Sequence, residues 1–218
     1  STSSDSTSSD STSSDSTSSA STSSASMSPD SGRDRIMDEA ATLFLRHGYE
    51  GTSLRQLADV VGMKAGSLYY HFASKDELLT EILRRGIDVM QQAFDAAAAA
   101  TDRDDPESRV GAHVRAHLAA LFENGPYTAA HVMTFRTSPE VVRGAVVPMR
   151  DAYEARWTGL LVELQEAGRI RSDTDVRIGR LALFGAMNSS VEWFDPTRGN
   201  LDEFATSITQ QFWNGVAA

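Results

Sequence analysis

The segment between Ser53 and Lys75 combines small, hydroxylated and basic residues. Both lysines of the chain, Lys64 and Lys75, lie close to the ends of its run AGSLYYHF. Ammonium and hydroxyl groups bind phosphate oxygens and base edges, and a small residue such as Gly66 lets the backbone approach a ligand closely. These residue types favour nucleic-acid binding.

The same segment has the spacing of two short helices joined by a tight turn. Ser53 and Gln56 predict a capping box at the start of the first helix, and Gly62 can adopt the left-handed conformation that ends it. The second helix is expected over 65–72. A small shared core is expected from Leu57, Val61, Met63 and Leu68. This is helix-turn-helix spacing, which presents the second helix to a major groove. The alternative is a packed pair of short helices in an ordinary all-α protein.

Hydrophobic residues recur with a helical period along the rest of the chain, and no convincing alternating strand is found. Further helices are expected over 31–47 and from a cap at Ser74 to about residue 100. The prediction is an all-α protein of about nine helices, with an N-terminal three-helix domain that contains the helix-turn-helix and the remaining helices in a C-terminal domain.

Prolines and capping residues divide the second half of the chain. Pro106, Pro126 and Pro139 suit the first turn of a helix, where a missing N–H costs nothing, whereas Pro148 should kink or divide its helix. Asp173 is predicted to cap a helix over 174–193. The last helix is expected over 201–215, with Asn200 and Glu203 at its start.

The composition excludes several kinds of site. The 218 residues include no cysteine, so disulfides, a thiolate nucleophile and a Cys-ligated metal are excluded. No apolar run reaches about 18 residues, so no membrane span is expected, and the cytoplasm is the expected location. Residues 1–26 contain only Ser, Thr, Asp, Ala and are expected to be a disordered leader added to the chain.

Charge is distributed unevenly along the chain, whose net charge is −10. Residues 31–86 carry eight Arg or Lys and eight Asp or Glu, whereas residues 87–218 carry twelve basic and eighteen acidic residues. The neutral part therefore coincides with the predicted helix-turn-helix, which is compatible with DNA binding despite the acidic total.

The run GTSLRQLADVVGMKAGSLYYHFASKDELL (51–79) resembles the N-terminal domain of the TetR family of bacterial repressors. One departure is Lys64, since many members have Ser or Thr at this cap position. The resemblance implies a DNA-binding domain over 27–76 and a ligand-binding and dimerisation domain over 77–218. Carried over by position, the DNA-facing residues are Thr52, Ser53, Arg55, Lys64, Gly66, Ser67, Tyr69, Tyr70, His71 and Lys75. Of these, Tyr69, His71 and Lys75 are expected on the DNA backbone and Lys64, Ser67 and Tyr70 on bases.

The C-terminal half is rich in aromatic and thioether side chains with interleaved polar groups, the mixture that a ligand cavity needs. The alternative is plain core. The candidate ligand-binding residues are Phe94, His113, His117, Phe122, Phe135, Met149, Tyr153, Trp157, Met187 and Asn188. His113 and His117 have the spacing of two metal ligands, but no clear third ligand accompanies them, so no metal site is expected.

Two late helices carry apolar residues on more than one face, so each needs two packing partners. One partner is the core of the chain, and a second subunit is expected to be the other; the alternative is a monomer core. The TetR resemblance implies a dimer seam of four helices at this place. The candidate dimer residues are Phe184, Gly185, Val191, Phe204, Ile208 and Phe212.

The runs LLVELQEAGRIRSDTDVRI and SSVEWFDPTRGNLDEFA are similar to one TetR branch, the acyl-CoA-responsive repressors of lipid and sterol breakdown. That similarity implies a long tunnel with arginines near its mouth. The candidates are Arg109, Arg136, Arg143 and Arg150.

Enzymatic motifs are missing from the sequence. The glycines of a nucleophile elbow do not flank Gly66 and Ser67, and neither a P-loop nor a dinucleotide-binding motif is found. No cofactor is expected. With the TetR resemblance, the expectation is a dimeric regulator of a palindromic operator in double-stranded DNA, released by a small hydrophobic effector such as an acyl-CoA. The alternative is a helical scaffold protein that does not bind DNA.

Overall fold

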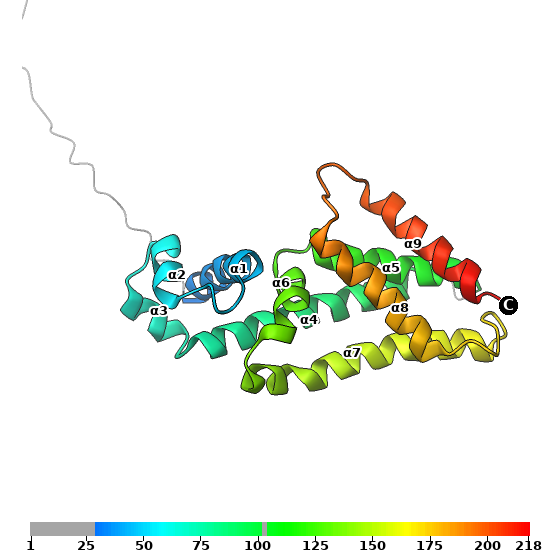
Figure 1. The fold of residues 1–218 in the computed structure, drawn as a ribbon, viewed down its shortest axis with the longest axis horizontal. Coiled ribbons are helices and arrows are strands. Elements are labelled where there is room, and N and C mark those ends of the chain that lie inside the picture. The colour runs from blue at the N-terminus through cyan, green and yellow to red at the C-terminus, as the bar shows by residue number, and fades with distance from the viewer. Residues whose placement is uncertain (1–28, 102–103) are drawn as a thin grey trace, which may run out of the picture.

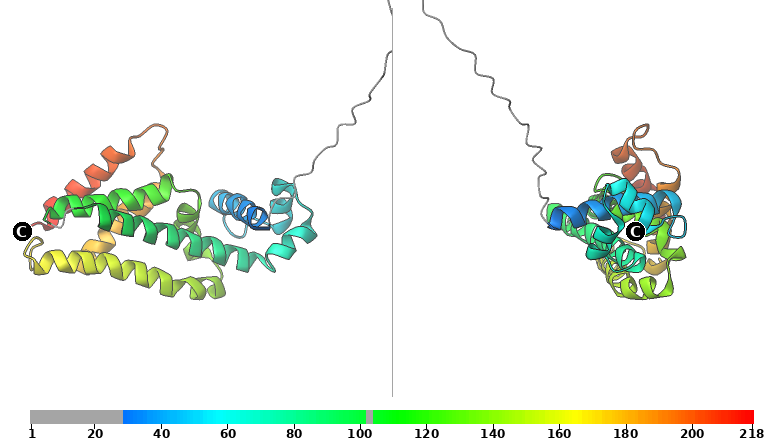
Figure 2. Two further views of the ribbon diagram at one scale, coloured as in Figure 1. Left: turned by 180° about the vertical axis from the view of Figure 1, so that it is seen from behind. Right: turned by 90° about the vertical axis from the view of Figure 1, so that its left-hand side faces the viewer.

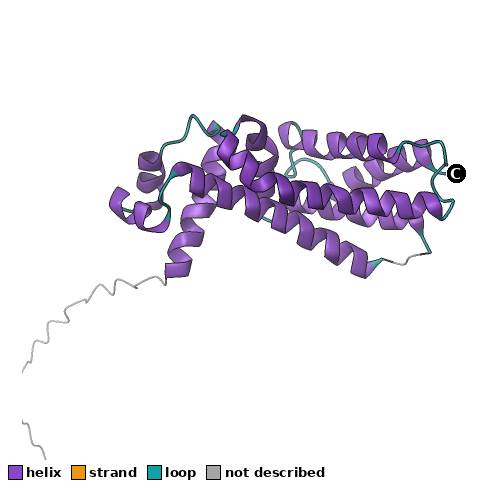
Figure 3. Ribbon diagram, turned by 90° about the horizontal axis from the view of Figure 1, so that it is seen from below, coloured by secondary structure: helices purple, strands orange, loops and turns teal. Residues whose placement is uncertain are grey.

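The computed structural model describes residues 29–101 and 104–218 (Figure 1). Over these residues the chain is helical, without a strand beyond one isolated bridge between Ile170 and Ala217 (Figure 3). The helices are α1 (Pro29–His47), α2 (Leu54–Val61), α3 (Ala65–His71), α4 (Lys75–Ala100), α5 (Pro106–Phe122), α6 (Tyr127–Thr134), α7 (Glu140–Glu166), α8 (Val176–Ser189) and α9 (Leu201–Val216), with short 3-10 turns η1 (Phe135–Thr137) and η2 (Ser190–Glu192). The all-α prediction is confirmed. The predicted leader, 1–26, lies outside the described residues.

The helices form two regions joined by α4 (Figures 1 and 2). We call α1–α3 with the first turn of α4 the head, and the rest of α4 with α5–α9 the bundle. The head lies at one end of the molecule and the C-terminus at the other. The predicted domain boundary at residue 76 falls inside the first turn of α4, so one unbroken helix carries the chain from one region to the other.

Local signals in the head act as the sequence predicts. The Ser53 hydroxyl accepts from the Gln56 amide at 3.2 Å, while the Gln56 side chain accepts from the Ser53 amide at 2.8 Å. Gly62 ends α2 with φ 72°, a left-handed conformation that favours glycine. Leu57, Val61 and Leu68 are buried beneath the turn. The helix-turn-helix geometry is therefore built from short-range contacts.

Two arginines of α1 fix the ends of the other head helices. The Arg35 guanidinium donates to the Val61 carbonyl of α2 at 2.7 Å, and that of Arg33 donates to the His71 carbonyl of α3 at 2.8 Å. Cations are favourable at helix C-termini because the last carbonyls lack partners there. These contacts fix the C-terminal ends of α2 and α3 against α1.

The bundle packs around α4 at a point of close approach. A Cβ atom at Gly86 would lie 2.6 Å from the Tyr127 carbonyl oxygen, so only glycine lets α6 approach α4 this closely. The Thr128 hydroxyl then donates to the Gly86 carbonyl at 3.1 Å. Trp157 of α7 is fully buried and contacts the rings of Phe94 and Phe184 edge-on. These rings connect α4, α7 and α8 through the centre of the bundle.

Two local predictions for the bundle need correction. Pro148 does not divide α7, which runs without interruption from Glu140 to Glu166. The cap of α8 is Asp175 and not Asp173, because the Asp175 carboxylate accepts from the amides of Arg177 and Ile178, whereas Asp173 pairs with Arg171.

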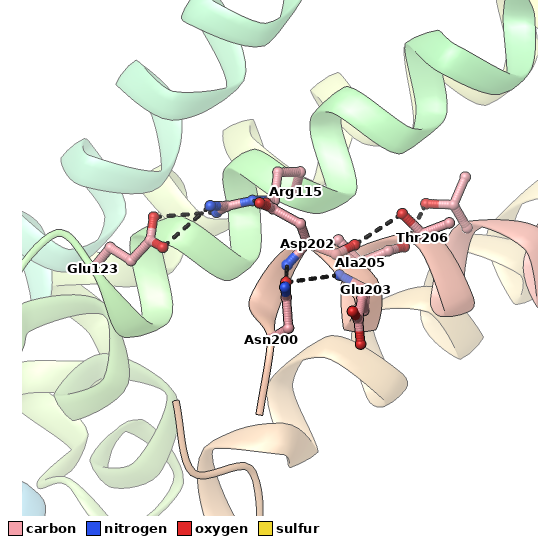
Figure 4. A network of polar contacts seen from close by, with 8 residues as sticks. Arg115, Glu123, Asn200, Asp202, Glu203, Ala205 and Thr206 are labelled. Carbon is pink, nitrogen blue, oxygen red and sulfur yellow. Dashed lines mark hydrogen bonds and ion pairs between the residues drawn. The ribbon is translucent and has the colours of Figure 1, made fainter. Parts of the chain in front are cut away.

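The start of α9 is attached to α5 by a polar network around Arg115 (Figure 4). The Arg115 guanidinium donates to both oxygens of Glu123, at 3.2 and 3.1 Å, and pairs with Asp202. Asn200 caps α9 as predicted, since its side-chain oxygen accepts from the amides of Asp202 and Glu203. The network fixes α9 against α5.

Candidate nucleic-acid interface and ligand cavity

The third helix has one face in the core and one face in solvent. Leu68 of α3 and Phe72 directly after it are fully buried and anchor the helix to the head. On the opposite face Tyr70 is 86 % exposed, Tyr69 is 55 % exposed, and Ser67 is exposed as well. A short helix that projects hydroxyl groups outward can reach base edges in a groove.

Other predicted DNA-facing residues surround this surface. Ser53 and Arg55 are exposed at the start of α2, and Lys64 and Gly66 are exposed at the start of α3. The Lys64 side chain makes no capping hydrogen bond, because an ammonium group cannot accept from a backbone amide. Lys64 is exposed to solvent. These positions agree with the predicted surface.

Three of the predicted DNA-facing side chains are placed differently. Thr52 is only 4 % exposed, and its hydroxyl donates to the Gly48 carbonyl at 2.9 Å. The Lys75 ammonium donates to the carbonyls of Tyr49 and Thr52, at 2.8 and 3.0 Å, and lies 3.8 Å above the Tyr49 ring. His71 is half-buried beside α1. The Thr52 side chain is therefore enclosed by the head and does not project from its surface, and the Lys75 side chain holds the loop before α2.

A cavity of about 590 Å³ opens inside the bundle. Its walls come from α4, α5, α6, η1, α7, α8 and η2. Apolar side chains such as Ile87, Met90 and Phe184 form much of the lining, and the polar residues include His117, His131, Arg136, Arg150, Glu154, Asn188 and Glu192. The volume lies within the range of small-molecule sites.

Two buried histidines contribute to the lining. His117 contacts the Tyr153 hydroxyl at 2.8 Å with Nδ1 and the Asn188 side-chain oxygen at 2.9 Å with Nε2. Since the amide oxygen accepts, Nε2 carries the proton and Nδ1 accepts from Tyr153. Burial lowers the pKa of His117 to about 4 and that of His131 to about 3. Both rings are therefore neutral at neutral pH.

The structure brings only part of the predicted ligand-binding set together. His117, Phe135, Tyr153 and Asn188 line the large cavity. Phe94 and His113 line a smaller cavity of about 290 Å³ beside Arg109, and Trp157 is fully buried behind the aromatic wall. The remaining residues, Phe122, Met149 and Met187, do not line the large cavity. Phe122 packs on Phe194, Met149 lies beside α1 near Arg33, and Met187 is enclosed in the core.

The arginine candidates divide in the same way. Arg136 and Arg150 line the large cavity, whereas Arg143 donates to the carbonyl of Ser138, five residues earlier in the chain. The predicted ligand-binding set does not include His131, Glu154 or Glu192, which line this cavity too. No spacing signal identifies them, because the cavity is assembled from helices far apart in the chain.

The predicted dimer residues are also divided. Phe184 is 8 % exposed and faces the cavity, and Ile208 is buried, so both side chains are largely enclosed by their own chain. Phe204 stacks on Phe194 at 4.8 Å and is half-buried, as are Val191 and Phe212. Gly185 is exposed. The exposed apolar face of α8 is instead formed by Ile178, Leu181, Ala182, Gly185 and Ala186.

Other kinds of site find no support in the described residues. Within them, no group of three or more His, Cys, Asp or Glu side chains could hold a metal ion. His113 uses Nδ1 on the Arg109 carbonyl at 2.7 Å, so the spaced histidine pair does not face one metal position. No helix in this part of the chain is long and apolar enough to cross a membrane.

Comparison with protein families gives two matches. Residues 36–82 match the model described as bacterial regulatory proteins of the tetR family. Residues 103–216 match the model of the tetracyclin repressor-like C-terminal domain. The matches therefore cover most of the head with the start of α4, and nearly all of the bundle that follows α4.

Among curated relatives, the HTH-type transcriptional repressor KstR2 of Mycolicibacterium smegmatis is 30% identical over 179 residues, which cover 77% of this chain and 82% of that protein. Among solved structures, the TetR family regulator PfmR from Thermus thermophilus has a TM-score of 0.73 and 29% identity, with 83% of this chain and 98% of that chain covered. AibR, solved in complex with isovaleryl coenzyme A and operator DNA, has a TM-score of 0.74 at 21% identity and covers 83% and 97% of the two chains.

Proposed function

Because the chain belongs to the TetR family of transcriptional regulators, which are DNA-binding proteins and not enzymes, we propose that it is a repressor released from its operator by a small effector. The observation that carries the proposal is the solvent exposure of Ser67 and Tyr70 on a helix whose other face is anchored by Leu68. The helical scaffold alternative offers no role for these side chains. As a regulator of operator DNA, the protein acts in the cytoplasm.

DNA binding divides between the two head helices. We assign Lys64, Ser67 and Tyr70 to base edges in the major groove, since they lie at the exposed start and face of α3. Ser53 and Arg55 at the start of α2, with Tyr69, are assigned to phosphates. Lys75 contributes indirectly, because its bonds to two carbonyls fix the loop from which α2 begins.

A homodimer would place two such helices on one palindromic operator. The exposed apolar face of α8 supports this, since Ile178 is 58 % and Leu181 46 % exposed in the single chain. Contiguous apolar surface of this kind is typical of an interface. Gly185 allows close approach of a second backbone on the same face. We therefore expect Leu181→Glu to give monomers in sedimentation experiments, whereas Val141→Glu on the exposed side of α7 leaves the dimer intact.

The large cavity is the proposed effector site. Its apolar walls and polar rim suit a small hydrophobic molecule with a charged end. The resemblance of two C-terminal runs to acyl-CoA-responsive repressors, and the isovaleryl coenzyme A in the structure of AibR, make an acyl-CoA the candidate class. Arg136 and Arg150 are the arginines that line this cavity.

Release of the operator would pass through α6. This helix carries His131 in the cavity wall and, one turn earlier, Tyr127, whose hydroxyl donates to the Asp38 carboxylate of α1 at 2.5 Å. Between them Thr128 bonds the Gly86 carbonyl of α4. A ligand that displaces α6 would thus move both α1 and α4. It shifts the equilibrium only if its affinity differs between the two states.

The test is selection of binding sites from random double-stranded DNA by the purified chain. We expect a palindromic consensus, and binding that weakens steeply with salt as phosphates are neutralised. Selection of no consensus, or an unchanged result with Ser67→Ala and Tyr70→Ala combined, would contradict the proposal.

A further inference from the structure

One ring nitrogen in the large cavity is an acceptor without a donor. His131 is 4 % exposed and lines the cavity, and its Nδ1 has no hydrogen-bond partner among the described residues. The ring also bonds the backbone of Leu83, which assigns the single proton of the neutral ring to Nε2. Nδ1 therefore presents a bare lone pair. Buried acceptors are nearly always paired, so an unpaired one requires an explanation.

One guanidinium of the same cavity has no acidic partner among the described residues. The Glu154 carboxylate accepts from Arg180 at 2.6 Å and from Arg150 at 3.3 Å, so one carboxylate serves two guanidiniums. Arg136 forms no ion pair with an acidic side chain in the described part of the chain. Glu192 is the second carboxylate on the lining. The lining thus holds two guanidiniums and two carboxylates, but Glu154 is already shared with Arg180, which lies outside the lining, and Arg136 has no acidic partner among the described residues.

The two features lie on one continuous surface. The Phe135 ring stacks on the His131 ring with centroids 5.6 Å apart. The Arg150 guanidinium lies 4.0 Å from the centroid of the same Phe135 ring. A cation above an aromatic face is held in place by the ring. The order along this wall is acceptor, apolar ring and cation.

We propose that the effector is an amphiphilic organic anion with a hydroxyl or N–H group that donates to His131 Nδ1 and an anionic group that binds Arg136 and Arg150. The inference rests on the proposed effector role of the cavity. An acidic ligand with a hydroxyl on its chain has this chemistry, and so does its coenzyme A thioester, whose negative charge lies on phosphates. The apolar body of either would occupy the space beside Ile87, Met90 and Phe184.

The test is calorimetric titration of the full chain with four probes: 3-hydroxydecanoate, decanoate, the neutral 1,3-decanediol and 3-hydroxydecanoyl coenzyme A. We expect a hydroxylated anion to bind about 5- to 100-fold more tightly than decanoate, because only it satisfies the buried acceptor. If the free acid binds more tightly than the thioester, the anionic group that the arginines bind is a carboxylate. If the thioester binds more tightly, the anionic groups are the phosphates of coenzyme A. Equal affinity for decanoate and both hydroxylated probes, a diol that binds as well as the acids, or no binding of any probe would overturn the inference.

Two variants assign the preference to residues. In His131→Leu the hydroxylated and plain acids should bind equally, and in Arg136→Gln the preference for anion over diol should fall. Val141→Ala, on the exposed face of α7, should change neither. If His131→Leu does not fold, ¹⁵N NMR of the wild-type ring supplies the readout, since the Nδ1 resonance should move on binding while the ring stays neutral; an unmoved resonance would contradict the inference.

The same samples separate this inference from the proposed function. A protein that binds its selected DNA sites but none of the probes keeps the proposed function and loses the effector chemistry. A protein that binds no DNA sequence selectively loses the proposed function, whatever it binds in the cavity.

Discussion

The head and the bundle are built by different kinds of contact. In the head, a capping box at Ser53, a left-handed Gly62 and two arginines of α1 fix short helices, and the residues assigned to DNA point outward. In the bundle, rings from α4, α5, α7 and α8 pack around Trp157, and the polar groups of the cavity point inward. Substitutions on the outward surface of the head should therefore have little effect on stability, whereas substitutions in the cavity of the bundle should also disturb the core.

The largest expected effect that tests this difference is loss of the central ring of the bundle. Trp157→Ala removes a fully buried side chain and should lower the free energy of unfolding by about 3–5 kcal/mol, measured by urea denaturation. Trp193→Ala is the matched control, because its ring is 60 % exposed and already mostly in water; it should cost about 1 kcal/mol or less. Equal losses in the two variants would mean that the aromatic core does not dominate the stability of the bundle.

Acid should destabilise the bundle through its buried histidines. Folding lowers the pKa of His117 to about 4 and that of His131 to about 3 because burial penalises the charged ring. The unfolded chain therefore binds more protons below its ordinary histidine pKa of about 6.5. The folded state is therefore most stable above a pH of about 6.5, where both rings are neutral in the folded and the unfolded chain. Its stability falls as the pH drops from about 6.5 toward the pKa values of the folded state, about 4 and about 3.

At pH 5 this linkage amounts to about 2 kcal/mol for each of the two rings. Thermal denaturation from pH 7.5 to 5 checks it. In His117→Gln the melting temperature should fall less steeply over this window than in the wild type. A wild-type melting temperature that is constant between pH 7.5 and 5 would contradict the neutral, buried assignment.

The sequence predicts the head better than the bundle, for a physical reason. Ser53, Gln56 and Gly62 act on residues three to five positions away, so their spacing alone fixes the local structure. The burial of Thr52 is not visible in the pattern because it depends on the Gly48 carbonyl at the end of α1. In the bundle, the two-faced apolar pattern of α8 predicts two partners but does not tell which face meets which, so Phe184, predicted in a dimer seam, lines the cavity instead.

A smaller effect is expected at the reading surface of the head. Tyr70→Ala should weaken binding to a selected operator by about 1–3 kcal/mol if the side chain contacts a base, measured by fluorescence anisotropy. The melting temperature should stay the same, because Tyr70 is 86 % exposed. Val60→Ala, on exposed surface of α2, is the control and should change neither quantity. A large fall in melting temperature for Tyr70→Ala would assign the ring to packing instead of recognition.

The smallest expected effect lies where the two regions meet. Tyr127→Phe removes the hydroxyl that bonds Asp38, which should lower stability by about 1 kcal/mol. The informative quantity is coupling: if α6 transmits the effector signal, operator DNA weakens effector binding by the same factor as the effector weakens operator binding. We expect this factor, measured with 3-hydroxydecanoate on free and operator-bound protein, to fall about 3- to 10-fold in Tyr127→Phe.

Tyr49→Phe is the matched control, since it removes another tyrosine–aspartate bond, to Asp76, inside the head. Equal coupling in Tyr127→Phe and the wild type would exclude this contact as the connection, whereas equal losses in both variants would reflect a general loosening of the head and not a path through α6.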